Sequence, residues 1–437
     1  MDGMMNVSNK FTQNRATLKL LFVGLLSLAM SIPLLFVRSI ISERQDLQFS
    51  AEQTITGRWG GAQSIGGLVA IMNSPAVHTD TRSIEKRWLW RANVLWDLAI
   101  SAELNTEWRY LGIYQVPVYT TQLHIEGRID RATLDNLQPE GDLIFWLPVG
   151  DVRGVREVSS LKLGALEIPA RPMTVMPDKY SGLQFTLPSA ERDRLEDTYS
   201  LEIKLAGSQS FQFLPLADNT RVNIEADWAH PEFIGQFLPA GRNIDEQGFE
   251  ANWQLTSLNR PYGDQWLMSE MSDHQLKAAG FGLRLETPVD GYQRSERSVK
   301  YGFLFIALTF FTLFLMEILT ARPLHPVPYI LTGAALAVFY LVLLALSEYL
   351  SFSRSFVIAA GLLVLIITPY AGTVLGGLSR GYLVGTMMSL TYALLYVLVS
   401  AQHLALLLGS LTLLVAISLL MYLTRNVDWY HYDNGES

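Results

Sequence analysis

Gly377-Leu-Ser379-Arg-Gly381 is the one stretch of the sequence that matches a catalytic motif, the G-x-S-x-G nucleophile elbow. Such an elbow needs a strand before the serine, a helix after it and a base within reach. The stretch instead lies in a short break between two apolar runs that are long enough to be membrane helices. Small residues recur there at a four-residue spacing, a pattern that lets helix backbones approach closely. We therefore interpret Gly376 and Gly381 as helix-packing positions and predict no catalytic residue.

Histidine and cysteine give no sign of a metal or redox centre. The chain has seven histidines, none at a spacing typical of metal ligands, and it has no cysteine. The H-E-x-x-H, Walker A and G-x-G-x-x-G motifs of zinc, phosphate and dinucleotide sites do not occur. We predict neither a metal site nor a bound cofactor.

Two carboxylates, Glu317 and Glu348, lie within or beside apolar runs, where an ionisable group is a functional hypothesis by itself. Glu317 lies about one turn from the end of its run, and Arg322 follows five residues later. Glu348 closes another run, with Arg354 beyond it. In one interpretation both carboxylates are interfacial and pair with the nearby arginine. In the other they serve a polar path or a partner site. We favour the interfacial interpretation for both.

Six apolar runs must position these groups, because a bilayer core about 30 Å thick is crossed by roughly 20 apolar residues in a helix. No small-residue cleavage site follows the first run, so we predict an uncleaved anchor rather than a signal peptide. The expected fold class is an α-helical membrane protein with six transmembrane helices, one plus five, and a large mainly-β periplasmic domain. The runs cover residues 20–37, 302–320, 327–346, 356–375, 382–400 and 404–423.

Lysine and arginine in the short segments set the expected orientation, because they are enriched on the cytoplasmic side. Three basic residues precede the first run, and alternation places three more on the same side, against Arg354 alone outside. We expect a multi-pass protein of the bacterial inner membrane with both termini in the cytoplasm. The predicted domains are residues 1–19 (cytoplasmic), 20–37 (helix 1), 38–300 (periplasmic), 301–424 (five-helix bundle) and 425–437 (cytoplasmic tail).

Charge is concentrated in the predicted external domain. Residues 38–300 hold 26 of the 33 Lys and Arg and 35 of the 41 Asp and Glu, and only 17% of the whole chain is charged. Soluble globular chains carry about 25%, so the composition excludes a soluble cytoplasmic enzyme. A net charge of −8 repels phosphate, which argues against nucleic-acid binding.

Residues 60–290 show mainly the apolar–polar alternation of strands, with turn signals between them. We predict many short strands in an antiparallel sandwich; the clearest cover residues 123–129, 161–168 and 199–205. Helix signals are few, at 42–54, which continues the first membrane helix, and at 190–196. Four tryptophans between Trp88 and Trp108 suit either a ligand platform or a sandwich core, and we favour the core.

Several segments along the whole chain resemble the CreD family, inner-membrane proteins of Gram-negative bacteria. They are IPLLFVR at 32–38, ISER at 41–44, RSVKYGFLFI at 297–306, HPVPY at 325–329, FYLVLLALSE at 339–348, LLLGS at 406–410 and YLTRNVDWY at 422–430. The resemblance implies the one-plus-five layout and a role in cell envelope integrity, under the control of a two-component regulon. It supplies no catalytic residues. Pro328 departs from the polar residue common at that position in relatives.

Two classes of function remain open. In the first, the protein is a non-enzymatic envelope protein whose periplasmic domain binds an envelope component or partner. The alternative is a lipid- or glycan-handling transporter or enzyme, with a site between the periplasmic domain and the bundle. The polar residues Glu43, Arg44, Arg297, Lys300 and Glu348 are interface anchors in the first and converge on a cleft in the second. The expected partners are the lipid bilayer, an envelope protein, glycan or lipid, and a second copy of the chain.

Overall fold

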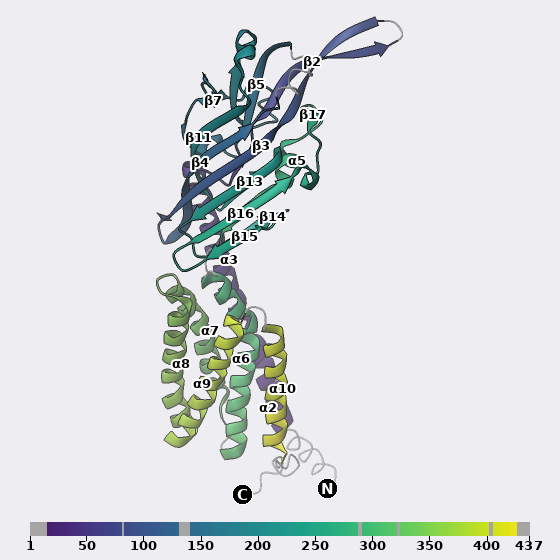
Figure 1. Cartoon of the computed structure of the whole chain (residues 1–437). Helices are drawn as coiled ribbons and strands as arrows, with labels where there is room; N and C mark the ends of the chain where they lie inside the picture. The colour runs from purple at the N-terminus through teal and green to yellow at the C-terminus, as the bar shows by residue number, and fades with distance from the viewer. Residues whose placement is uncertain are drawn as a thin grey trace, which may run out of the picture. The chain divides into compact units, whose positions relative to one another are not determined.

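The computed structural model describes residues 15–80, 83–130, 140–286, 291–320, 324–401 and 405–425. The chain forms two compact units (Figure 1). One is helical and combines residues up to Gln48 with those from Val289 onwards; the other is mainly β and covers Phe49–Pro288. The predicted boundaries at 38 and 300 lie inside two helices, because each of these helices continues past its apolar run.

The helical unit consists of long apolar helices. Within the described residues, five are long and apolar enough to cross a membrane: Leu21–Trp59, Gly291–Glu317, Pro326–Ser347, Phe352–Val374 and Leu378–Ser400. They correspond to the first five predicted runs, and the sixth run coincides with a further helix. The helices are α2 (Arg15–Ala29), α3 (Ser31–Trp59), α6 (Gly291–Thr320), α7 (Pro326–Ser347), α8 (Phe352–Val374), α9 (Leu378–Ser400) and α10 (Ala405–Thr424).

The first apolar run is divided between α2 and α3. Helix α2 ends at Ala29, because Pro33 has no N–H to donate to the Ala29 carbonyl. Beyond Pro33, α3 continues without interruption to Trp59. This confirms the prediction that residues 42–54 extend the first membrane helix.

The end of α3 is fixed within the β unit. The guanidinium carbon of Arg109 lies 4.3 Å from the centroid of the Trp59 ring and that of Arg156 lies 5.0 Å from it. The Trp59 indole also donates a hydrogen bond to the carbonyl of Tyr119 at 3.2 Å. Just after the helix, the backbone N–H of Gly61 donates to a carboxylate oxygen of Asp151 at 3.0 Å.

Within the described residues, the β unit contains a sheet of fourteen strands and a sheet of four. The structure confirms a mainly-β domain but corrects two details of the prediction: β3 is 29 residues long rather than short, and β13 runs parallel to it. The small sheet has the order β1-β12-β18-β14. The strands are β1 (Gln63–Gly66), β2 (Val69–Asp80), β3 (Ser83–Leu111), β4 (Tyr114–Arg128), β5 (Glu140–Pro148), β6 (Val155–Val158), β7 (Leu161–Leu163), β8 (Leu166–Ile168), β9 (Arg171–Pro172), β10 (Gly182–Leu187), β11 (Thr198–Ser208), β12 (Ser210–Leu214), β13 (Ala217–Ala226), β14 (Pro231–Gly235), β15 (Gly241–Ile244), β16 (Phe249–Thr256), β17 (Gln265–Leu267) and β18 (Phe281–Leu285).

Two short segments differ from the prediction. Residues 161–168 form the hairpin β7–β8 rather than one strand, because Gly164 adopts a φ of 60°, which reverses the chain. Residues 190–196 fall mostly in a 3₁₀ helix, Ser189–Arg194, and the one α-helix inside the described part of the β unit is α5 (Asp273–Ala278).

Aromatic side chains join the two sheets. Phe211 of β12 packs against Tyr119 of β4 with ring centroids 5.8 Å apart, and Phe281 of β18 packs against Trp253 of β16 at 5.6 Å. These side chains and their aliphatic neighbours form one buried cluster. One face of the large sheet is therefore covered, and along β4, β13 and β16 the alternate residues face solvent.

Candidate functional site

A charged hollow of about 540 Å³ lies on the solvent face of the large sheet, where β3, β4, β7, β11 and β13 meet. Arg128 donates to Asp97 of the facing strand through Nε at 2.7 Å, and Asn219 donates to the other oxygen of Asp97 at 3.0 Å. Lys162 and Arg221 also line the hollow, both exposed. Within the described residues, neither of these two cations has an ion-pair partner.

A second hollow, of about 370 Å³, is acidic and is lined by residues further along β3, β4 and β13 and by Glu250 of β16. Glu225 on β13 stands opposite Glu103 on β3 and Glu250 on β16. Like charges placed directly opposite one another destabilise a sheet, so this row is costly without a compensating partner. His124, also in this hollow, lies 2.6 Å from a carboxylate oxygen of Glu126.

The two hollows are lined mainly by polar and charged side chains. Among the residues that the structure describes, no three His, Asp or Glu side chains are placed to hold a metal ion. The charged side chains of the two hollows are largely exposed, so water is not excluded from them. What the arrangement offers is a broad polar face with cationic and anionic parts side by side, which suits recognition of a charged surface. This face could not be predicted from the sequence, because its residues come from six strands.

Glu348 lies in a polar cluster of the helical unit, but with a different partner from the one predicted. Its carboxylate lies 3.5 Å from Nε of Arg44, and the Tyr292 hydroxyl donates to it at 3.4 Å. The predicted Arg354 pairing is wrong, because Glu348 ends α7 where α3 and α6 pass beside it. Of the other candidates, Arg297 is half-buried and Lys300 is exposed, and no described carboxylate pairs with either.

Glu317 is 1% exposed, so the expectation of an exposed interfacial carboxylate is wrong. The Tyr329 hydroxyl of α7 donates to its carboxylate at 3.0 Å. Phe310 lies about two turns before Glu317 on α6 and packs edge-on against the Tyr329 ring, with ring centroids 5.9 Å apart. Its predicted partner Arg322 lies outside the described residues. Tyr329 could not be found from spacing alone, because it lies on another helix.

The glycines near Ser379 have two different roles. Gly381 of α9 touches α8: a Cβ there would lie 2.6 Å from the carbonyl oxygen of Thr368 and 2.7 Å from Cα of Gly372. Gly376 is exposed and adopts a φ of 72° in the turn, so its prediction as a packing position is wrong. Ser379 lies in the first turn of α9, and helix α8 rather than a strand precedes it. The string therefore lacks the geometry of an elbow.

The tryptophan side chains that the structure describes between Trp90 and Trp108 do not form one platform. Trp108 packs against Trp228 with ring centroids 5.5 Å apart, and Trp90 is partly buried against the second core cluster. Trp96 is 47% exposed. The side chain of Trp88 lies outside the described residues. The core interpretation is thus confirmed for Trp90 and Trp108 and is wrong for Trp96.

A family model and one curated relative each match nearly the whole chain. The family model described as inner membrane protein CreD matches residues 15–430. Inner membrane protein CreD of Escherichia coli (strain K12) is 30% identical over 418 residues, which is 93% of this chain and 92% of that protein. Among solved structures, a mutant M1 zinc metallopeptidase from Deinococcus radiodurans aligns with a TM-score of 0.19 and 9% identity, over 37% of this chain and 38% of that one. That TM-score is too low to show a shared fold. The family match and the curated relative show that the chain belongs to the CreD family of inner membrane proteins.

Proposed function

We propose that this protein supports the integrity of the cell envelope without catalysing a reaction, by binding an envelope component through its β unit. In this proposal the β unit lies in the periplasm and both termini lie in the cytoplasm, in keeping with the basic residues of the short segments. Expression under a two-component regulon belongs to the same proposal, since the family resemblance implies it.

The observation that carries the proposal is the charged solvent face of the large sheet. Two exposed cations, Lys162 and Arg221, have no described ion-pair partner, and three glutamates face one another nearby. Water screens these uncompensated charges only in part, and they gain energy when a surface of complementary charge approaches. The face therefore suits a partner that is itself charged, such as an envelope protein or an acidic glycan.

The experiment places a photocrosslinker on this face in intact cells. The chain has no cysteine, so Asn223→Cys gives one labelling position inside the acidic hollow, and Arg171→Cys on β9 gives an exposed control. A membrane-impermeant benzophenone maleimide is attached and photolysed. We expect one discrete adduct from position 223 and none from position 171.

Charge reversal ties the adduct to the face and to the phenotype. The double variant Lys162→Glu with Arg221→Glu should abolish the adduct and the complementation of a deletion strain at normal protein level. Arg171→Glu is the matched control and should leave both unchanged. Equal adducts from both positions, or full complementation by the double variant, would contradict the proposed role of this face.

A further inference from the structure

An apolar groove of about 1180 Å³ runs along the junction of α8 and α9 in the helical unit. On α8 it extends from Phe356 to Pro369, which is fourteen residues or roughly 20 Å of helix. Leu365 and Val397 stand exposed among the lining residues. The groove is therefore open to the surroundings of the bundle and is about as long as two thirds of a hydrocarbon core of about 30 Å.

Small residues leave the groove empty. Gly361 on α8 has no heavy atom within 4 Å of the place a Cβ would occupy. Ser389 and Ala393, four residues apart on α9, line the same groove and are exposed. At the junction itself Gly385 lies against Thr368, so the helices touch there and the groove has a floor. Bulkier side chains at these positions would fill the volume.

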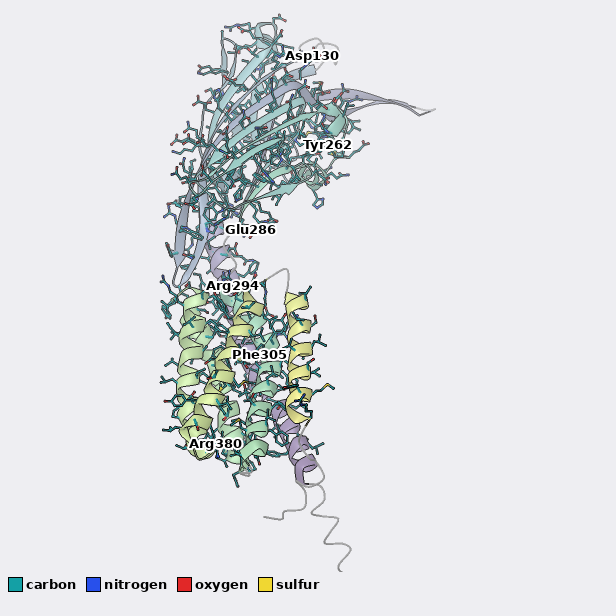
Figure 2. All side chains as sticks on the ribbon, turned by 60° about the horizontal axis from the view of Figure 1, so that its bottom comes forward. Asp130, Tyr262, Glu286, Arg294, Phe305 and Arg380 are labelled. Carbon is teal, nitrogen blue, oxygen red and sulfur yellow. The ribbon has the colours of Figure 1, made fainter. Side chains whose placement is uncertain are left out.

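One end of the groove is positively charged. Arg354 precedes Val357, Gly361 and Leu365 at intervals of three and four residues, so it lies on the groove face of α8, in the first turn of the helix. It is exposed and has no ion-pair partner among the described residues. The guanidinium of Arg294 lies 5.8 Å from the ring centroid of Phe352, at this same end. Figure 2 labels Arg294 at this end of the bundle and Arg380 at the other.

Hydroxyl groups and the helix terminus add to this charge. The Tyr396 hydroxyl donates to Oγ of Ser353 at 2.9 Å, beside the first turn of α8. The N-terminus of a helix carries a partial positive charge that favours anions. Below these groups, Phe356 packs against Tyr396 with ring centroids 5.4 Å apart. Arg354, Ser353 and Tyr396 thus form a polar, cationic mouth, which leads directly into the apolar groove.

We propose that this groove binds one anionic phospholipid, with its phosphate at Arg354 and an acyl chain lying between α8 and α9. The length suits a chain from one leaflet, whose share of the hydrocarbon core is about 15 Å. A transmembrane helix of a second copy also suits small residues. The cationic mouth distinguishes the two occupants, because a phosphate complements it, whereas a membrane helix presents mainly apolar side chains. The proposal is independent of the partner proposed for the β unit.

Native mass spectrometry of the purified full-length protein tests the proposal, with phosphatidylglycerol and phosphatidylcholine supplied at equal concentration. Both lipids carry a phosphate, but the choline cation cancels the headgroup charge of phosphatidylcholine and is repelled by Arg354. The wild type should therefore retain one phosphatidylglycerol about tenfold better than phosphatidylcholine. Arg354→Gln should remove the preference. Gly361→Leu should remove retention of both lipids, because the leucine side chain would extend into the groove from a position whose Cβ meets no heavy atom within 4 Å.

Two matched variants serve as controls. Gly24→Leu on α2 also enters open space, and Lys300→Gln removes another exposed cation of the helical unit; both should behave as the wild type. Wild-type retention of lipid by Gly361→Leu, or an absence of headgroup preference in the wild type, would overturn the proposal. A wild-type dimer that becomes monomeric in Gly361→Leu, with lipid retention unchanged, would assign the groove to a second copy instead.

Discussion

Replacement of Gly381 by alanine tests whether backbone contact holds α8 and α9 together. The added Cβ would lie 2.6 Å from the carbonyl oxygen of Thr368 and 2.8 Å from the amide nitrogen of Gly372. Both are backbone atoms, so no side chain can turn away, and the helices must separate by roughly 1 Å to restore ordinary contact. Packing is the main force that joins helices in lipid, so this separation removes stabilising contacts along the junction.

The expected magnitude follows from two opposing effects. Overpacking costs about 1–3 kcal/mol, and the better helix propensity of alanine returns up to about 1 kcal/mol. We expect a net loss of about 1–2 kcal/mol, which raises the population of the open bundle roughly 5- to 30-fold. Gly361→Ala is the matched control on α8, because its Cβ meets nothing within 4 Å. It should leave stability unchanged or raise it slightly.

Thiol labelling gives the assay. Nine of the ten tryptophans lie in the β unit, so intrinsic fluorescence does not report on the bundle. Met388 of α9 is 1% exposed, and Met388→Cys provides a single thiol that reacts with a fluorogenic maleimide only when the bundle opens. Labelling should be faster in the Gly381→Ala background than in the parent or in Gly361→Ala. Equal rates in all three backgrounds would refute the packing argument.

Three further predictions concern topology, a buried carboxylate and acid stability. Reporter fusions after residues 60, 200 and 290 should be periplasmic and those after 324, 379 and 437 cytoplasmic; a cytoplasmic signal at 200 would exclude the proposed orientation. Glu317→Gln keeps an acceptor for the Tyr329 hydroxyl and should leave the protein level near normal. Tyr329→Phe removes a hydrogen bond to a buried carboxylate and should lower the stability of the bundle by about 1–3 kcal/mol, measured by the same labelling assay. A larger loss of stability in Glu317→Gln than in Tyr329→Phe would contradict this. The hydrogen bonds from Arg153 lower the pKa of Asp151 in the folded protein. The stability that Asp151 contributes is therefore complete above its pKa in the unfolded chain, near 3.8, and is lost as the pH falls through its lower pKa in the folded protein. Thermal unfolding followed by tryptophan fluorescence should therefore show Asp151→Asn destabilised at pH 7, with the difference narrowing below about pH 4; a constant difference at every pH would rule this out.

The positions of the membrane helices were determined by the sequence alone. Lipid offers no hydrogen-bonding partners, so a run of about 20 apolar residues has to close its backbone bonds within itself as a helix. The extension of α3 to Trp59 was equally local, since it needed only an unbroken helical pattern after Pro33. The existence of strands in the β unit also followed from alternation along each segment.

Tertiary structure decided which residues meet. Glu348 pairs with Arg44, some 300 positions earlier, instead of with Arg354 six positions later. The packing of α3 beside the end of α7 brings these two distant residues into contact. Gly376 and Gly381 are both glycines in the same four-residue spacing pattern. Gly376 nevertheless lies in the turn with a positive φ, whereas Gly381 contacts α8. The charged face of the large sheet and the groove between α8 and α9 arise in the same way, from several strands or two helices packed side by side. Periodicity along one element specifies which face is apolar, but the neighbour of that face depends on contacts between elements far apart in the chain, which no local pattern encodes.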